Sequence, residues 1–389
     1  MQRVVMVASA VHPIPPSKAA AAEWWMLQSC RRLRGWEPHI VAIAAKGQAS
    51  VERVEGVTLH RVSIGRAYKR VFQKLTRLDP WPYEKRVGAQ VRAIAPAIVH
   101  VHNAPRLFCA LAGPVDPQRL VLHLHNEVKV ACAERVRWCI TPSAYLASVV
   151  RRTLTAAEVR VVPNGVDVAL FGEATSRRAA LPATADGKKV IVYAGRMSPE
   201  KGPLLLVRAF AVLRQRRDDV FLMLVGEFRH DGPACDRTRY GDEIRRVAVG
   251  FAADCSIVGV VPHDHMQDVY ALADLVVVPS TFEAFGMVAL EALAAGKPVL
   301  AFATGGLPEF IVDGENGFLM PGTDEPLALA DRIDALLADP ARLERVGQAA
   351  RASAVDYDWS VVARRLEAAY AEVLAAVEAP LSRTRSPAA

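Results

Sequence analysis

The sequence predicts an α/β protein built from two doubly wound domains, and three observations support this fold class. The chain has 389 residues, the length of two ordinary domains. Hydrophobic residues make up 52% of it and charged residues 23%, which excludes a disordered chain, a collagen and a disulfide-stapled secreted module. Short apolar runs alternate with segments of helical period in both halves, as in βα units on a parallel sheet.

Each half supplies its own series of strands. In the first half, residues 19–33 are predicted as the helix that follows the first strand. The predicted strands of that half are residues 4–8, 39–44, 97–101 and 120–124. The predicted strands of the second half are residues 189–194, 221–225, 256–261, 274–278 and 298–301. The two series predict two separate parallel sheets.

Breaks in this pattern set the domain boundaries. We expect a first domain over residues 1–167, a linker over 168–188 that contains Gly172, Pro182 and Gly187, and a second domain over 189–355. A terminal helix is expected within 356–378, and a disordered tail over 379–389. Asp356 and Asp358 have the Asp-x-Asp spacing of some metal sites, but we interpret them as surface or helix-capping residues.

Cysteine use and targeting signals favour the cytoplasm. No apolar run reaches the length of about 18 residues that a membrane span needs, and the chain begins directly with a strand-like segment. The six Cys residues form no Cys-x-x-Cys pair and no Cys-His group at zinc spacing. Reduced, mostly buried thiols are therefore expected.

Charge is unevenly distributed. Through Gly165 the chain has 24 Lys and Arg against 10 Asp and Glu, and the remainder has 24 against 31. The basic half predicts an anionic partner, such as a membrane surface, a lipid-linked phosphate or a nucleic acid. Residues 66–92 hold eight basic and two acidic residues beside Phe72, Trp81 and Tyr83, which favours peripheral binding at a membrane. The alternative is a solvated helix face.

Two cations follow the first strand of the second half. Residues 195–202 read Gly-Arg-Met-Ser-Pro-Glu-Lys-Gly, and neither half has Gly-x-Gly-x-x-Gly after its first strand, so NAD chemistry is not expected. Arg196 offers a fork for phosphate oxygens and Lys201 a compact charge, a combination that suits a diphosphate. Ligands of open α/β sheets bind at this end of the strands. An ordinary solvated loop is the alternative.

A second loop in this half combines carboxylates with a helix start. Residues 279–287 follow the strand at 274–278 and lead into a helix that Gly296 and Pro298 terminate. Gly286 lets the backbone approach a ligand, and amides of the first helical turn can bind phosphate. Glu283 and Glu291 could each accept hydrogen bonds from two sugar hydroxyls. The alternative for Glu291 is a solvent-facing helix residue.

These segments resemble a known family, the retaining glycosyltransferases of family 4, which have the GT-B fold. The resemblance is strong over residues 160–375 and most specific in the Glu-x7-Glu pair. It implies two Rossmann-like domains facing a cleft, with the terminal helix crossing back to the first domain. It also implies transfer of a sugar from a nucleoside-diphosphate donor to a hydroxyl acceptor without a metal or cofactor. Surface-polysaccharide or lipopolysaccharide assembly on a lipid-linked acceptor is the preferred setting.

The resemblance also assigns roles to residues of the second half. Arg196 and Lys201 would bind the donor diphosphate, Glu283 a hydroxyl of the donor sugar and Glu291 the ribose hydroxyls. The backbone at Gly195, Gly286 and Met287 would lie against the donor.

The first half matches more loosely. His125 falls where the family places a histidine near the reacting sugar, whereas His102 and His123 are expected to be structural. The loop after the first strand lacks the family's Gly-Gly pair and carries Lys18 instead. Lys18, Glu23 and Asn103 are acceptor-side candidates, and the alternative for Glu23 is ordinary helix surface.

Two other functions stay open. One is a nucleotide-sugar epimerase of the same fold, which would use an acid and a base in place of an acceptor site. The other is a nucleic-acid-binding protein that uses the basic half, but the sequence has no signature of an RNA-binding or helix-turn-helix module, so we expect no nucleic acid. The sequence indicates a peripheral protein at the inner face of the cell membrane and leaves the donor sugar and base undefined.

Overall fold

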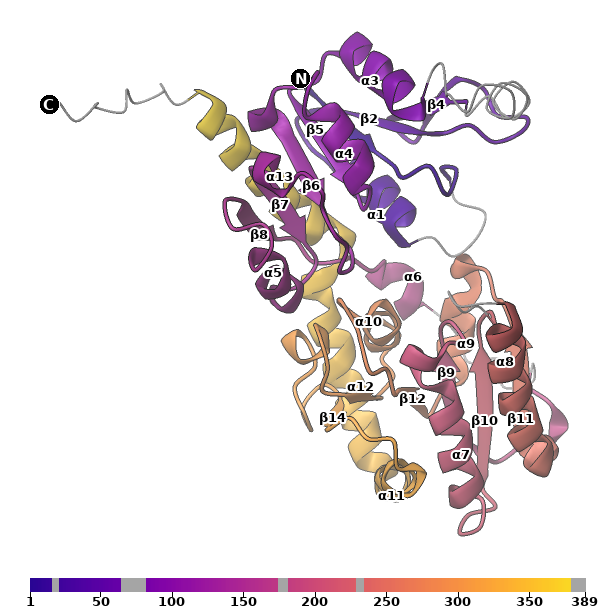
Figure 1. The fold of residues 1–389 in the computed structure, drawn as a ribbon. Coiled ribbons are helices and arrows are strands. Elements are labelled where there is room, and N and C mark those ends of the chain that lie inside the picture. The colour runs from indigo at the N-terminus through magenta and orange to yellow at the C-terminus, as the bar shows by residue number, and fades with distance from the viewer. Residues whose placement is uncertain (16–20, 64–81, 174–180, 229–233, 379–389) are drawn as a thin grey trace, which may run out of the picture. The chain divides into compact units, whose positions relative to one another are not determined.

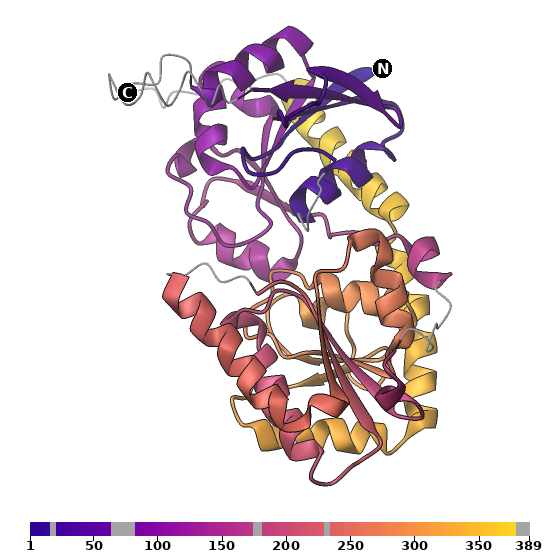
Figure 2. The same cartoon turned by 90° about the vertical axis from the view of Figure 1, so that its right-hand side faces the viewer.

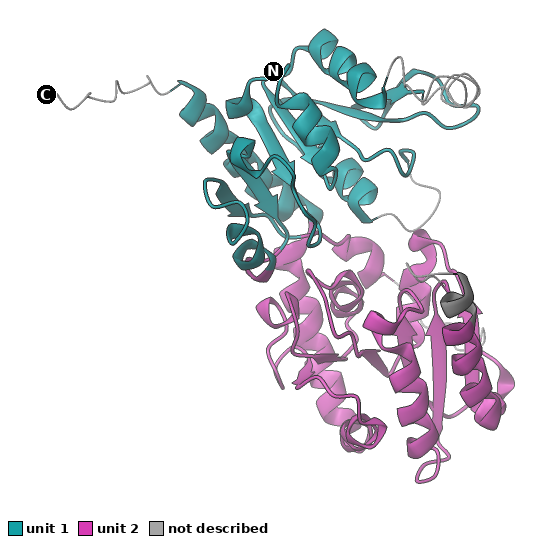
Figure 3. Ribbon diagram, viewed as in Figure 1, with its two compact units in different colours: residues 1–142, 146–163, 359–389 teal, residues 143–145, 164–358 magenta. Residues whose placement is uncertain are grey.

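Two mostly parallel sheets form the framework of the computed structural model, which describes residues 1–15, 21–63, 82–173, 181–228 and 234–378 (Figure 1). The chain divides into two compact units (Figure 3). Unit 1 comprises residues 1–142, 146–163 and 359–389, and unit 2 comprises residues 143–145 and 164–358. The predicted doubly wound architecture with two sheets is confirmed.

Unit 1 contains an eight-stranded sheet in the order β3-β4-β2-β1-β5-β6-β7-β8, parallel except for the β3–β4 pair. Its strands are β1 (Gln2–Val7), β2 (Trp36–Ile43), β3 (Val51–Val54), β4 (Val57–Val62), β5 (Ile98–His102), β6 (Leu120–His123), β7 (Trp138–Thr141) and β8 (Glu158–Val161). Its helices are α1 (Ala21–Cys30), α3 (Tyr83–Ile94), α4 (Pro105–Leu111), α5 (Ala144–Arg151) and α13 (Trp359–Glu378). The division between units cuts α5, whose first two residues group with unit 2.

One face of the unit 1 sheet is covered by α1 and α13. Trp25 of α1 and Tyr370 of α13 belong to one buried cluster with strand residues Met6, Ile98 and Val121. The terminal helix thus returns to the first sheet, as expected, although it follows the second unit in the chain. It begins at Trp359, directly after Asp358.

Unit 2 contains a six-stranded, fully parallel sheet in the order β11-β10-β9-β12-β13-β14. Its strands are β9 (Lys189–Ala194), β10 (Val220–Val225), β11 (Cys255–Gly259), β12 (Leu275–Val278), β13 (Val299–Phe302) and β14 (Phe318–Met320). Its helices are α6 (Val168–Gly172), α7 (Pro203–Leu213), α8 (Ala234–Ala248), α9 (Met266–Leu272), α10 (Met287–Ala294), α11 (Pro326–Leu337) and α12 (Pro340–Ala354). The second view of the ribbon shows the strands of this sheet side by side (Figure 2).

Both faces of the central part of the unit 2 sheet are buried, because alternate residues of β9, β12 and β13 join different clusters. Val190 and Val192 of β9 pack with α10, whereas Ile191 and Tyr193 pack with α7 and α11. Residues 168–188, expected as a linker, lie within unit 2, where α6 places Phe171 in the core. Residues 379–389, expected as a disordered tail, lie outside the described residues.

Two expectations about single residues are wrong. Cys109 and Cys132 form a disulfide with a Cα–Cα distance of 5.8 Å, whereas reduced thiols were expected. The 23-residue separation in sequence gave no signal of this contact. Tyr83 is only 7% exposed, so this side chain belongs to the core of unit 1 and does not face a membrane. Residues 66–81, most of the basic stretch 66–92, lie outside the described residues.

Candidate active site

Three loops of unit 2 meet where the strand order of its sheet reverses. β9 and β12 are neighbours in the sheet although two strands separate them in sequence, and such a switch point is the usual ligand position in open α/β sheets. Glu200 O of the loop after β9 accepts a hydrogen bond of 2.9 Å from Thr281 N of the loop after β12. Glu283 O accepts one of 3.0 Å from Gly306 N of the loop after β13. The three loops are therefore tied together by backbone hydrogen bonds.

Lys201 and Glu283, predicted from separate motifs, form an ion pair in this structure. Lys201 Nζ lies 2.7 Å from Glu283 Oε1 and donates a second hydrogen bond of 3.4 Å to Phe282 O. Their side chains are 19% and 14% exposed. Each charge is therefore held in a fixed position by the other, at the carboxyl ends of two adjacent strands.

Arg196 lies in the same loop as Lys201 but has a different partner. Arg196 Nη2 is 3.4 Å from Glu200 Oε1, and the carbonyl of Arg196 accepts a hydrogen bond of 2.6 Å from Tyr193 Oη. Burial disfavours the charged form of Glu200, but the hydrogen bond from Ser198 and the positive charges of Arg196 and Lys201 outweigh it and lower the Glu200 pKa. The loop thus keeps an ionised carboxylate beside its two cations.

Glycines make the close approach of these loops possible. Gly202, with φ +70°, precedes α7, and a Cβ at this position would lie 2.2 Å from Pro279 O. Gly305 has φ +58°, and its Cβ would lie 1.7 Å from Glu283 O. Both positions therefore exclude any residue with a side chain. Gly195 has φ +137° directly after β9.

Gly286 and Met287 form the start of α10. Gly286, the residue before the helix, has φ +108°, and Met287 is the first helical residue. A Cβ at Gly286 would lie 2.3 Å from Leu307 Cδ2. The first amides of α10 follow directly on the loop that carries Glu283, so positive partial charge lies at this end of the sheet.

Glu291 is buried, 6% exposed, and both its oxygens contact other side chains. Its Oε1 is 3.2 Å from His263 Nε2, and Tyr270 Oη donates a hydrogen bond of 2.8 Å to Oε2. The hydrogen bond with Glu291 raises the pKa of His263, against the opposing effect of burial. The solvent-facing alternative for Glu291 is wrong. A carboxylate has about four acceptor positions, so two remain for a ligand.

Sequence reasoning missed His263 and Tyr270 as partners of Glu291. His263 comes a few residues after β11, and its position beyond the carboxyl end of a predicted strand was the signal that could have found it. Tyr270 lies inside α9 among apolar residues, and nothing in its surroundings marks it.

Two candidates of unit 1, Asn103 and His125, follow the carboxyl ends of β5 and β6, which are adjacent in the sheet. Glu23 of α1 is 4% exposed and accepts a hydrogen bond of 3.3 Å from Ser9 Oγ, so the surface alternative for Glu23 is wrong. Asn103 has φ +46° and donates a backbone hydrogen bond of 2.8 Å to His123 O. Lys18 lies outside the described residues.

His125 belongs to a histidine cluster, which also contains His100, His102 and His123. Its Nε2 is 3.2 Å from His102 Nδ1, and its ring stacks on that of His123 at a centroid distance of 4.0 Å. Burial lowers the pKa of His125 to about 4 and that of His100 to about 3. Near neutral pH these imidazoles are therefore uncharged.

Solved structures with the same fold cover nearly the whole chain. Sucrose-phosphate synthase from Thermosynechococcus elongatus matches with a TM-score of 0.78 and 24% identity over 96% of this chain and 100% of that chain. Anabaena Alr3699/HepE in complex with UDP-glucose matches with a TM-score of 0.70 and 20% identity over 97% of this chain and 100% of that chain. The protein thus has the GT-B fold of glycosyltransferases.

Sequence relatives and family models give the family. A lipopolysaccharide 1,2-N-acetylglucosaminetransferase of Salmonella typhimurium is 33% identical over 375 residues, or 94% of this chain and 97% of that protein. A D-inositol 3-phosphate glycosyltransferase of Corynebacterium diphtheriae is 35% identical over 55% of this chain and 50% of that protein. The model "Glycosyl transferases group 1" matches residues 179–353, and "Glycosyltransferase Family 4" matches residues 25–170. The chain is a glycosyltransferase and belongs to glycosyltransferase family 4.

Proposed function

We propose that the protein transfers an N-acetylglucosamine or a related sugar from a UDP-sugar to a hydroxyl of a lipopolysaccharide or another lipid-linked glycan. The ion pair between Lys201 and Glu283 at the switch point of unit 2 carries the proposal for the donor site, because it combines a phosphate-binding cation with a hydroxyl-binding carboxylate. The choice of sugar and acceptor follows the name of the Salmonella relative, which matches this chain along almost its whole length.

The donor would bind across the three joined loops. Lys201 and Arg196 would lie against the diphosphate, with the amides of Gly286 and Met287 at the start of α10. Glu283 would accept a hydrogen bond from a sugar hydroxyl, and Glu291, held by His263 and Tyr270, would accept those of the ribose. His125 and Asn103, with Lys18 and Glu23, would serve the acceptor side.

The reaction would keep the anomeric configuration. As the glycosidic bond stretches, negative charge accumulates on the diphosphate, and Lys201 and Arg196 stabilise that charge where it develops. The acceptor hydroxyl would attack from the face that the diphosphate leaves, and the leaving phosphate would take its proton. Protein cations thus supply the stabilisation that a metal ion supplies in other transferases.

The protein would work at the inner face of the cell membrane. None of the described helices combines the length and the apolar character that a membrane crossing requires. The basic residues of 66–92 would bind anionic lipid electrostatically. The disulfide between Cys109 and Cys132 is unusual for a cytoplasmic protein, so the state of these thiols in cell extracts is a direct check of this location.

A donor screen tests the proposed function. The screen would compare four donors: UDP-N-acetylglucosamine, UDP-glucose, UDP-galactose and GDP-mannose. For each donor, one measurement is the shift in the melting temperature of the protein. The other is the mass of a truncated lipopolysaccharide acceptor after the reaction. We expect a stabilising UDP-sugar, a product heavier by one sugar residue and a retained anomeric configuration by NMR. A donor sugar altered without acceptor would indicate an epimerase, and salt-sensitive RNA binding without any donor affinity would indicate a nucleic-acid-binding protein.

Metal dependence is tested separately. We expect full turnover in an assay that contains excess EDTA and no added metal, because the charges at the donor site belong to the protein. Activity that EDTA abolishes and that Mg²⁺ or Mn²⁺ restores would contradict the proposed role of Lys201 and Arg196.

A further inference from the structure

Four histidines of unit 1 lie on one face of its sheet. His100 and His102 are two residues apart on β5, and His102 pairs in register with His123 of the adjacent strand β6. His125 follows His123 at the same spacing. Side chains two residues apart on a strand share a face, so these rings lie on the side that α1 and α13 cover.

His100, His102 and His123 are almost completely buried, with exposures of 0%, 1% and 0%. Trp25 of α1 closes the cluster, with its ring 4.6 Å from that of His123 and 5.1 Å from that of His102 between centroids. Polar atoms in such a place need partners, because they have lost their hydrogen bonds to water.

Two of these rings have one nitrogen each with a hydrogen-bond partner. His100 Nδ1 is 2.7 Å from Tyr370 Oη, and His102 Nδ1 is 3.2 Å from His125 Nε2. Among the described residues, no hydrogen-bond partner reaches His100 Nε2, His102 Nε2 or either nitrogen of His123. Each of the three rings therefore has at least one buried nitrogen with a free lone pair or N–H.

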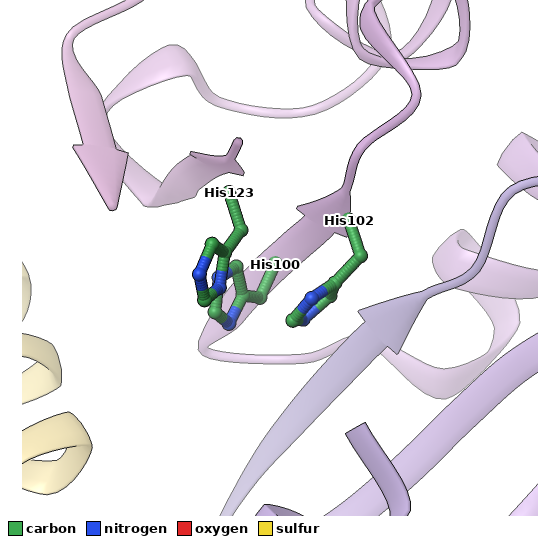
Figure 4. A group of neighbouring side chains, drawn as sticks. All are labelled: His100, His102 and His123. Carbon is green, nitrogen blue, oxygen red and sulfur yellow. The ribbon is translucent and has the colours of Figure 1, made fainter. Parts of the chain in front are cut away.

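The ring nitrogens converge. One ligand nitrogen from each of the three rings lies within 4.8 Å of the others, and the sticks show the three rings grouped together from β5 and β6 (Figure 4). Nitrogens bound to one tetrahedral zinc ion lie about 3.3 Å apart, given bonds of about 2.0 Å. Binding would draw the rings together through side-chain rotation while the strands stay paired.

We propose that His100, His102 and His123 bind one divalent transition-metal ion, with zinc as the best match for three imidazoles. Neutral imidazole is the ligand form that zinc, copper and nickel prefer. Tyr370 and His125 contact the opposite nitrogens of His100 and His102, which is how metal-binding histidines are usually oriented. The ion would join β5 and β6 and, through Tyr370, fix α13 against the sheet.

The role of this ion is structural, and it is separate from the donor chemistry. Every residue of the proposed metal site belongs to unit 1, whereas Lys201, Glu283 and Glu291 belong to unit 2. The proposal therefore does not depend on the proposed function, and its measurements need no substrate. The alternative is a metal-free histidine cluster whose free nitrogens bind buried water.

The test measures metal in the whole chain without a polyhistidine tag. Bound metal is removed from the protein with a strong chelator, and the chelator is removed by dialysis. One to two equivalents of Zn²⁺ are then added, and the protein is passed through a desalting column. The zinc that remains bound is measured by elemental mass spectrometry. We expect about one zinc ion per chain and a higher melting temperature in the zinc-loaded protein. Stripped protein that retains no zinc after this treatment, with no change in melting temperature, would overturn the proposal.

Variants locate the ion. His123→Phe keeps the size of the ring and removes a ligand, so it should bind less than a tenth of the zinc. The control His60→Phe changes a half-buried histidine of the same sheet, which stacks on His39, and should bind zinc as the wild type does. Equal zinc in His123→Phe and the wild type would overturn the assignment.

Tyr370→Phe covers the case in which His123→Phe does not fold. It removes only the hydroxyl that contacts His100, and we expect zinc affinity to fall about 10- to 100-fold with the far-UV circular dichroism unchanged. Unchanged affinity in a folded Tyr370→Phe protein would contradict the proposed orientation of His100 and with it the site.

Discussion

The two sheets have the same switch-point topology, but the ends of their strands carry different chemistry. At the switch between β9 and β12, glycines let backbones touch, and the ion pair of Lys201 with Glu283 lies between the loops. At the switch between β1 and β5, buried histidines, Trp25 and Glu23 fill the same position. One sheet thus presents fixed charges on loops, whereas the other depends on close packing of rings contributed by distant segments.

The largest expected effect comes from removing the cation at the unit 2 switch point. Lys201→Ala should lower kcat about 10²- to 10³-fold, because in the proposed mechanism this charge stabilises the leaving diphosphate. The fold should persist, since Lys201 lies in a loop and not in the core. Arg216→Ala, at an exposed arginine paired with Asp331, is the control and should leave kcat unchanged. Near-normal turnover with normal donor affinity in Lys201→Ala would show that the switch point is not the donor site.

Gly305→Ala tests whether the loops of unit 2 depend on the close approach of their backbones, in contrast to the packed rings of unit 1. The new Cβ would lie 1.7 Å from Glu283 O at a φ of +58°, so the loops must separate. We expect a loss of about 1–3 kcal/mol in the free energy of unfolding, measured with urea, and weaker donor binding. Gly250→Ala, with open space around its Cβ and no positive φ, should be nearly neutral. Equal stability of the two variants would mean that the loop contact is not constrained.

The ion pair of Glu291 with His263 predicts that the stability lost in a Glu291→Gln variant depends on pH. Because the folded protein raises the pKa of His263 above its usual value of 6.5, the stabilisation is fully present below about pH 6.5. It is lost as the pH rises through the raised pKa. Glu291→Gln should therefore lower the melting temperature most in mildly acidic buffer and least in alkaline buffer. The exposed control Glu344→Gln should show no such trend, and a pH-independent difference for Glu291→Gln would contradict the ion pair.

The smallest expected effect concerns the basic character of unit 1. Each Lys or Arg near an anionic surface contributes about 1 kcal/mol, screened over about 8 Å at physiological salt. Changing Lys69, Arg70, Lys74 and Arg77 to Glu should reduce co-sedimentation with anionic liposomes and its sensitivity to salt.

The matched control makes the same change of net charge in unit 2 and should bind liposomes as the wild type does. This control changes four exposed arginines to Glu, namely Arg208, Arg216, Arg246 and Arg345. Equal binding by both variants would show that residues 66–92 are only a solvated surface.

Much of the fold follows from apolar periodicity. The predicted strand at 189–194 coincides with β9, and most other predicted strands differ from the observed ones by one or two residues, because continuous apolar runs mark buried parallel strands. The pair β3 and β4 was missed, since β3 has four mostly exposed residues, and so were β7, β8 and β14. Short or half-exposed strands lack the apolar run on which the prediction depends.

The position of the candidate site in the fold was predictable where its motifs are local. Lys201 and Glu283 were identified from loops at strand ends, although their contact at 2.7 Å depends on the order of strands in the sheet. His263 was missed as the partner of Glu291, because that contact joins the segment after β11 to helix α10, 28 residues further along the chain. The histidine cluster was not predicted. Strand alternation could have placed His100 and His102 on one face of the sheet, but the burial beneath Trp25 and Tyr370 comes from helices distant in sequence.

The long segment of unit 2, residues 164–358, begins and ends at nearly the same point. Val166 N donates a hydrogen bond of 2.9 Å to Tyr357 O, and Val166 forms a β-bridge with Asp358. Residues 164–358 are thus one continuous insertion with adjoining ends, so they can be exchanged for the corresponding segment of another enzyme without lengthening either connection. Under the proposed function, chimeras cut at the two ends of this segment would combine the donor preference of one parent with the acceptor preference of the other.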